Sequence, residues 1–319
     1  MRKALAAALM AAAIGAIHAE PAAESLAAAN DALQAGAADR ALMILSTLPP
    51  SAPAHNLRCR VLFTLERWDA ATSECEAAVR MDGENSDFHM WLGRGLGEEA
   101  SRASFMSAYS DAKHSRAEFE AAVRLDPRNA EALADLGEFY SSAPGIVGGG
   151  NDKANRVVAE LDQVDPARAH ELKARIAESN KDYDTAESEF KRAVELSRHP
   201  AFQWMTLGSF YRRQGRSLDA ESAVQNGVKA AQRDRTAGVA LFNGASVLTG
   251  INRNPALAAK MLENYLNGPG MTEEAPAFVA HTRLARVLLQ LGDRDDARKE
   301  RDEALALAHD YRPALELKF

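Results

Sequence analysis

The chain has 319 residues and a net charge of −7, from 38 lysines and arginines against 45 aspartates and glutamates. An acidic chain is a poor candidate for binding nucleic acid or anionic lipid through its overall field, so we predict neither partner. The length exceeds that of one typical domain, but a repeat array of this size can act as one elongated unit.

Residues 1–19 have the features of a cleavable secretory signal. Arg2 and Lys3 form a basic start, an unbroken apolar run follows over residues 4–17, and Ala19 is a small residue at the exit. The run is shorter than the stretch of about 20 apolar residues that crosses a membrane. We therefore expect a bacterial protein that is periplasmic or secreted, with no membrane span once the signal is cleaved near Glu20. The alternative is that the run is an alanine-rich first helix of the fold.

The two cysteines, Cys59 and Cys75, leave two alternatives open. In an exported protein they are able to form a disulfide. We favour the other interpretation, in which both thiols are buried as small apolar residues. No histidine stands at the spacing of a zinc site around them.

A helical pattern recurs along the chain from residue 52 onward. Units begin near Ala52 and Ser86, and again near Ala167 and Ala201, and the two intervals are equal. The clearest unit contains a W-x2-L-G-x2-Y pattern whose large side chains fall on one stripe of a helix, with small residues where a second helix approaches. In chain order, the marker residues are Ala71 and Ala78; Leu92 and Gly93; Phe119, Ala122 and Pro127; Leu133, Leu136, Gly137 and Tyr140; Ala154 and Pro166; Ala186, Phe190 and Ala193; Trp204, Leu207, Gly208, Tyr211 and Ala220; Phe242 and Ala258; Leu284, Ala285, Leu288, Gly292 and Ala297.

This pattern resembles the tetratricopeptide repeat (TPR), a helix–turn–helix unit whose length of about 34 residues equals the interval between those starts. The resemblance covers nearly all of residues 20–319, and no alternating apolar and polar run calls for strands. It implies an all-α fold, a right-handed superhelical solenoid of about seven to eight antiparallel helix pairs. Two units are enlarged, at 86–129 and 130–166. In the first we expect the extra residues to lengthen the second helix, with Phe105, Met106 and Tyr109 packed on the core.

The second enlargement contains APGIVGGGNDKA, residues 143–154. The lysine stands two places too late for a phosphate-binding P-loop, and no strand precedes it. We predict an inter-helix loop in which Asn151 or Asp152 caps the next helix. The alternative is that it binds an anion or a partner through Gly148, Gly149, Gly150, Asn151 and Lys153. A similar loop occurs in exported bacterial TPR proteins that carry APGIVGGG-x-x-KA after an LGEFY-like helix.

No catalytic or metal-binding motif stands out: H-E-x-x-H, C-x-x-C and G-x-S-x-G are all absent. We therefore predict a protein that is not an enzyme and has no cofactor and no metal.

The resemblance implies a concave groove lined by the first helices, and an arginine-lined strip in it suits an acidic segment or a terminal carboxylate. Arg60, Arg94 and Arg175 occupy equivalent positions in their units. The alternative is that these arginines pair with neighbours such as Glu138, Glu171 and Glu178. We predict an exported adaptor for a protein or peptide in the cell envelope, or else a small acidic ligand-binding accessory of a transport system. The candidate groove residues are Asn56, Arg60, Arg94, Arg175, Met205, Arg212 and Arg286.

Overall fold

The computed structural model describes residues 23–319, and the predicted signal peptide, residues 1–19, lies outside this range. The regular secondary structure of the described residues is helical. No helix within this range is both long enough and apolar enough to cross a membrane.

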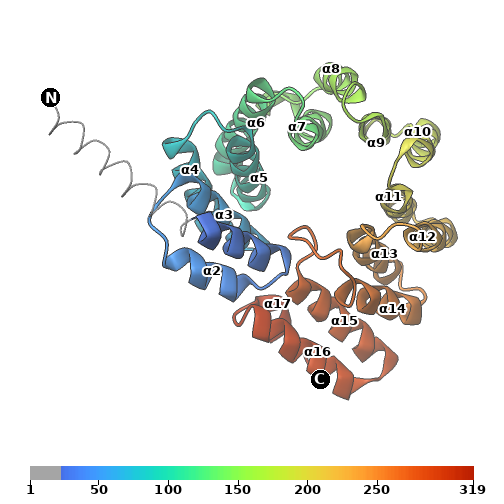
Figure 1. Cartoon of the computed structure of the whole chain (residues 1–319). Helices are drawn as coiled ribbons and strands as arrows, with labels where there is room; N and C mark the ends of the chain where they lie inside the picture. Colours follow the sequence, from blue (N-terminus) through green and yellow to red (C-terminus); the bar gives the residue numbers. More distant parts are fainter. Residues whose placement is uncertain (1–22) are drawn as a thin grey trace, which may run out of the picture.

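The helices follow one another in antiparallel pairs, which confirms the predicted all-α solenoid (Figure 1). The first pair consists of a helix over residues 23–34 and α2 (Ala38–Ser46). The first helices of the later pairs are α3 (Ala52–Thr64), α5 (Ser86–Arg102), α7 (Ala130–Ser142), α9 (Pro166–Ser179), α11 (Pro200–Arg213), α13 (Gly238–Gly250) and α15 (Ala277–Leu291). Their partners are α4 (Trp68–Met81), α6 (Phe105–Leu125), α8 (Asn151–Asp162), α10 (Tyr183–Leu196), α12 (Ser217–Ala231), α14 (Pro255–Leu266) and α16 (Arg294–Leu307). A 3-10 turn, η1 (Gly145–Val147), precedes α8, and the short α17 (Arg312–Leu315) follows the last pair.

The turn inside most pairs contains one residue with a left-handed backbone. Gly215 (φ 70°) and Gly292 (φ 87°) provide it before α12 and α16, and glycine adopts this conformation without steric cost because it lacks a Cβ. Glu66 (φ 60°) and Lys181 (φ 62°) take the same conformation before α4 and α10. The chain can therefore reverse within two or three residues, and the second helix packs directly on the first.

Small residues allow the helices to approach closely, and one predicted groove residue uses the space that they leave. Met205 on α11 is 1% exposed. A Cβ on Gly227 would lie 2.5 Å from the Met205 methyl carbon, and one on Gly244 would lie 2.6 Å from its sulfur. The two glycines thus make room for the thioether. Met205 is a core residue, and the prediction that it lines the groove is wrong.

The solenoid closes on itself, so that its first and last helices lie side by side (Figure 1). Leu33 and Leu57 share one buried cluster with Phe278 and Tyr311. The rings of Phe278 and Tyr311 meet edge to face with their centroids 4.8 Å apart. The described chain therefore forms a ring with the first helix of each pair turned toward its centre, where an open, curved array was expected.

Polar side chains at the rim of this cluster join the same two ends. Arg67, just before α4, pairs with Asp310, just before α17. His309 contacts Asp39 on α2 at 2.9 Å. Because Asp39 and His309 are 270 residues apart in sequence, repeat spacing carries no information about this contact.

The enlarged unit has a different surface from the predicted one. Its second helix, α6, has 21 residues and its first, α5, has 17, so the extra residues lengthen both helices and not α6 alone. Phe105 and Met106 at the start of α6 are 75% and 76% exposed, and Tyr109 is 38% exposed. The prediction that these three side chains pack on the core is wrong, because all three are exposed.

The two cysteines form a disulfide, contrary to the interpretation that we favoured. Cys59 on α3 and Cys75 on α4 face each other across one helix pair, with their Cα atoms 5.3 Å apart. Both residues are fully buried. The bond thus cross-links a helix pair within the solenoid.

Candidate functional site

The centre of the ring contains a cavity of about 1100 Å³. Its walls come from α3, the start of α4, α5, α7, the start of α9, α13 and α15, and from the connection 267–276 between α14 and α15. Side chains from units far apart in sequence therefore face one space. Four arginines line it together with aromatic rings and carboxylates: Arg60, Arg94, Arg168, Arg283, Phe63, Trp68, Trp91, Phe242, Glu131, Glu273 and Glu274.

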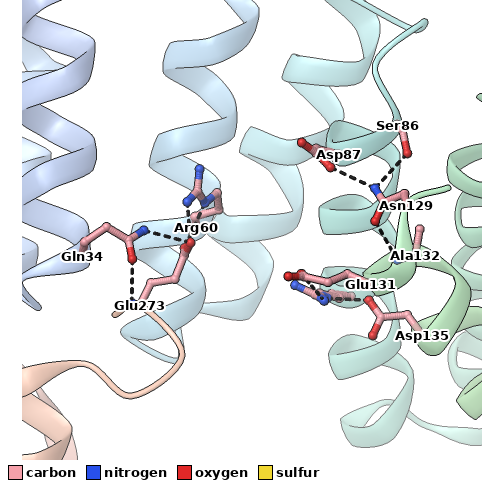
Figure 2. A network of polar contacts seen from close by, with 10 residues as sticks. Gln34, Arg60, Ser86, Asp87, Asn129, Glu131, Ala132, Asp135 and Glu273 are labelled. Carbon is pink, nitrogen blue, oxygen red and sulfur yellow. Dashed lines mark hydrogen bonds and ion pairs between the residues drawn. The ribbon is translucent and has the colours of Figure 1, made fainter. Parts of the chain in front are cut away.

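Arg60 is already bound by a carboxylate of the same chain. Its Nε donates to Glu273 Oε2 at 2.9 Å, and a second guanidinium nitrogen contacts the other carboxylate oxygen. Gln34 donates to the same carboxylate at 3.1 Å and accepts from the Glu273 backbone N–H at 3.3 Å. Figure 2 shows Glu273 extending from its connection toward Arg60, with Gln34 beside it. Only 12% of the Glu273 side chain is exposed, so this pair is well shielded from water.

Arg94 on α5 is held by the next unit. Its Nε donates to Asp135 at 2.6 Å and another nitrogen donates to Glu131 at 3.2 Å. Both carboxylates are on α7 and are labelled in Figure 2. Its guanidinium also lies 4.7 Å from the centre of the Trp91 ring. Burial opposes the charge of Arg94, but the two carboxylates outweigh it and raise the pKa of this arginine. Desolvation raises the pKa of Asp135 in turn.

Arg283 on α15 differs from these two, because no carboxylate of residues 23–319 lies within ion-pair distance of it. Its guanidinium lies 4.0 Å from the centre of the Phe242 ring and donates to the Ser246 hydroxyl. Burial lowers the pKa of Arg283. The cavity is also lined by Asn56 on α3, which is 6% exposed and whose Oδ1 has no hydrogen-bond partner among the described residues.

The other candidate arginines do not line this cavity. Arg175 on α9 pairs with Glu171 at 2.9 Å and with Glu138 at 3.5 Å, as in the alternative interpretation. Arg212 packs over Gly250 on α13. Arg286 is exposed and donates to the carbonyl of Pro313 at 3.2 Å.

The glycine-rich loop uses its own N–H groups, and this argues against the anion-binding alternative. Gly148, Gly149 and Gly150 donate to backbone carbonyls between residues 140 and 145. Gly150 is the N-cap residue of α8, which has no side-chain cap, so the predicted cap by Asn151 or Asp152 is wrong. The Asn151 side chain donates to Asn180 at 2.7 Å instead, and Lys153 donates to the Gly148 carbonyl at 2.8 Å.

A second cavity, of about 880 Å³, lies where the two enlarged units meet. It is mostly apolar, and its walls are the C-terminal part of α5, the extension of α6, the end of α7 and the loop 142–147. Ile146 on this loop is 63% exposed. The cavity exists because both departures from the standard repeat length lie next to each other.

Sequence reasoning missed Glu273 and Arg283. Glu273 belongs to an acidic pair in a connection that also contains Gly-Pro-Gly. This composition was the feature of the sequence that could have indicated an unusual connection with a role in the site. Arg283 stands three residues before the predicted Arg286, nearly one helical turn away on the same helix. The predicted groove residue of this unit, Arg286, therefore lies nearly one helical turn beyond the arginine that lines the cavity.

Comparisons with known proteins agree with the fold. Residues 167–200 match the family model described as tetratricopeptide repeat. This stretch begins at the unit start predicted near Ala167 and ends directly before the next one, near Ala201. Helix pairs on both sides of it repeat the same architecture, so the fold is a TPR-type helical solenoid.

Superkiller complex protein 3 of Mus musculus is 25% identical over 295 residues, which cover 89% of this chain and 18% of that protein. The chain therefore spans less than a fifth of the length of this curated relative. A thermophilic TPR protein of Thermus thermophilus, TTC0263, is 19% identical with a TM-score of 0.45, over 62% of this chain and 100% of the other. Pseudomonas aeruginosa pilF is 16% identical with a TM-score of 0.38, over 72% and 95% of the two chains.

Proposed function

We propose that this protein is an exported, non-catalytic adaptor that binds a protein or peptide partner through the inner face of its ring. The observation that carries the proposal is the central cavity, where arginines and aromatic rings from distant units face one space. Arginine and aromatic side chains are enriched at the residues that dominate binding energy in protein interfaces. Solenoids of this type present the inner faces of their repeats as binding surfaces.

Two features support a location in the cell envelope. Residues 1–19 read as a secretory signal. The Cys59–Cys75 disulfide fits an oxidising compartment, because cytosolic thiols are normally kept reduced. We propose the periplasm or the exterior of a bacterial cell.

A second candidate function is the binding of a small acidic molecule as an accessory to a transport system. Arg283 favours it, since this arginine lines the cavity with no described carboxylate within ion-pair distance. A cavity of about 1100 Å³ is large for such a ligand, because pockets for drug-sized molecules measure roughly 300–1,000 Å³. A peptide segment therefore fits the space better.

The test compares two charge reversals of the same type. Arg168→Glu changes the inner cavity at a side chain that is 41% exposed and only loosely paired, at 3.5 Å, with Asp165. Arg192→Glu is the matched control on the exposed face of α10. Mature protein of residues 20–319 is used to capture partners from envelope extract, and each captured protein is identified, purified and titrated against all three forms.

We expect a partner that binds the parent and the Arg192→Glu control equally and the Arg168→Glu variant at least tenfold more weakly. Circular dichroism checks that both variants keep the helical content of the parent. A partner lost equally in both variants would contradict binding through the inner face. If small dicarboxylic acids raise the melting temperature of the parent and no protein partner depends on Arg168, the transport accessory replaces the adaptor.

A further inference from the structure

The connection 267–276 is unlike the other connections between helix pairs. It has ten residues, whereas the others have between three and six. It contains Gly268, Pro269 and Gly270 and then the acidic pair Glu273 and Glu274. Its acidic part lines the central cavity. An inserted segment of the chain thus occupies the surface that the proposed function assigns to a partner.

The bond between Glu273 and Arg60 has the form of a ligand contact. A bidentate pair between guanidinium and carboxylate is the strong, geometrically specific type of ion pair. Gln34 adds two hydrogen bonds, one to the carboxylate and one from the Glu273 backbone. If a partner molecule inserted an extended segment with a glutamate, Arg60 and Gln34 could make the same contacts with that segment. The contact with Glu273 therefore indicates that this part of the cavity binds a carboxylate on an extended segment.

The base of the connection is held independently of this contact. The Tyr265 hydroxyl donates to the Ala275 carbonyl at 2.5 Å and accepts from the Thr272 N–H at 3.2 Å. Gly270 passes so close to Gly238 that a Cβ on Gly238 would lie 2.7 Å from the Gly270 oxygen. Loss of the Glu273 carboxylate thus leaves the connection anchored and makes Arg60 available.

We propose that the connection 267–276 is an internal occupant of the groove, and that the partner binds through an acidic extended segment that displaces Glu273 from Arg60. This inference rests on the proposed function and adds the partner's chemistry and its regulation. The occupant lowers the apparent affinity for the partner, because the partner binds only the fraction of molecules in which Arg60 is free. The apparent affinity is the intrinsic affinity multiplied by that fraction. A tethered group competes at an effective concentration in the millimolar range, so only a segment with further contacts displaces it.

The probe is a synthetic peptide with the chain's own sequence, GPGMTEEAPA, residues 268–277. A second peptide carries glutamine in place of both glutamates. Binding is measured by isothermal titration calorimetry to the parent and to Glu273→Gln. Glu263→Gln is the matched control, because this glutamate on α14 is exposed, lies outside the cavity and forms no ion pair within the described chain.

We expect the acidic peptide to bind Glu273→Gln at least tenfold more tightly than it binds the parent or Glu263→Gln. The glutamine peptide should bind none of the three. Arg60→Gln alone would leave the Glu273 carboxylate without its partner, so the role of Arg60 is tested in the double variant Arg60→Gln/Glu273→Gln, which is expected to lose the gain. Equal binding to the parent and Glu273→Gln, no binding to Glu273→Gln, or full binding by the double variant would each overturn the proposal.

The outcome also separates this inference from the adaptor function. If Arg168→Glu abolishes partner capture but Glu273→Gln gains no affinity for the peptide, the adaptor stands and the internal occupant is wrong. If the peptide gains affinity but no partner depends on Arg168, the groove has the proposed chemistry and the adaptor function is wrong.

Discussion

Gly137 and Gly208 occupy the same place in the L-G-x2-Y pattern but have different surroundings. A Cβ at Gly137 would lie 2.2 Å from Leu172 Cδ2, inside the contact of α7 with α9. At Gly208 the nearest atoms to such a Cβ are 3.4 to 3.6 Å away, which is ordinary van der Waals contact. One motif position therefore carries two different packing constraints.

This difference gives a prediction for the alanine variants. Gly137→Ala is expected to lower the free energy of unfolding by about 1–3 kcal/mol, because the buried Leu172 side chain must leave its rotamer. Gly208→Ala is expected to be neutral or to add up to about 1 kcal/mol, because alanine favours the helix over glycine. Urea denaturation of the two variants checks this, and equal losses in both would contradict it.

At the scale of the element, a histidine–glutamate contact joins the two helices in several of the pairs. In four pairs a histidine Nδ1 on the first helix lies 2.5 to 2.6 Å from a glutamate on the second. The spacing is 19 residues in three of them and 29 in the enlarged unit, whose longer helices add ten: His55–Glu74, His170–Glu189, His281–Glu300 and His89–Glu118. This regular spacing was readable in the sequence, and it fixes how the two helices of a pair are aligned.

The Cys59–Cys75 disulfide strengthens one such pair covalently. A bond that closes a loop of about 15 residues stabilises a folded protein by about 3 kcal/mol, chiefly by restricting the unfolded chain. We expect dithiothreitol to lower the free energy of unfolding of the parent by that amount and to leave Cys59→Ala/Cys75→Ala unchanged. Urea titrations with and without reductant measure it. If reductant has no effect on the parent, the two cysteines are not joined in the protein.

At the scale of the whole molecule, local patterns and long-range contacts differ in what the sequence reveals. The repeat spacing predicted the helix pairs correctly, because a helix stripe such as Trp204, Leu207 and Tyr211 is set by neighbours in sequence. The closure of the ring was not predictable, because Arg60 and Glu273 are 213 residues apart and no periodicity relates them. The candidate site was predicted in part for the same reason. Arg60 and Arg94 follow the repeat register, whereas Glu273 comes from an insertion.

Closure changes how the solenoid is expected to unfold. In an open array the terminal repeats unfold first and exchange their amide hydrogens fastest, since they contact a neighbour on one side only. In this ring the terminal helices also contact each other through Tyr311, which is 4% exposed and packs on Phe278. The Tyr311 hydroxyl additionally lies 3.5 Å from Glu66, which precedes α4. The two ends therefore stabilise each other across the closure.

Tyr311→Ala is expected to open this contact and to cost about 3–5 kcal/mol locally, the usual range for removing a large buried aromatic side chain. Amide hydrogen exchange over residues 23–48 should become faster, and the radius of gyration from small-angle X-ray scattering should increase. Leu315→Ala on α17 is the matched control, since this side chain is 56% exposed and should change neither measurement. Unchanged exchange over residues 23–48 in Tyr311→Ala would show that the remaining contacts alone keep the ring closed.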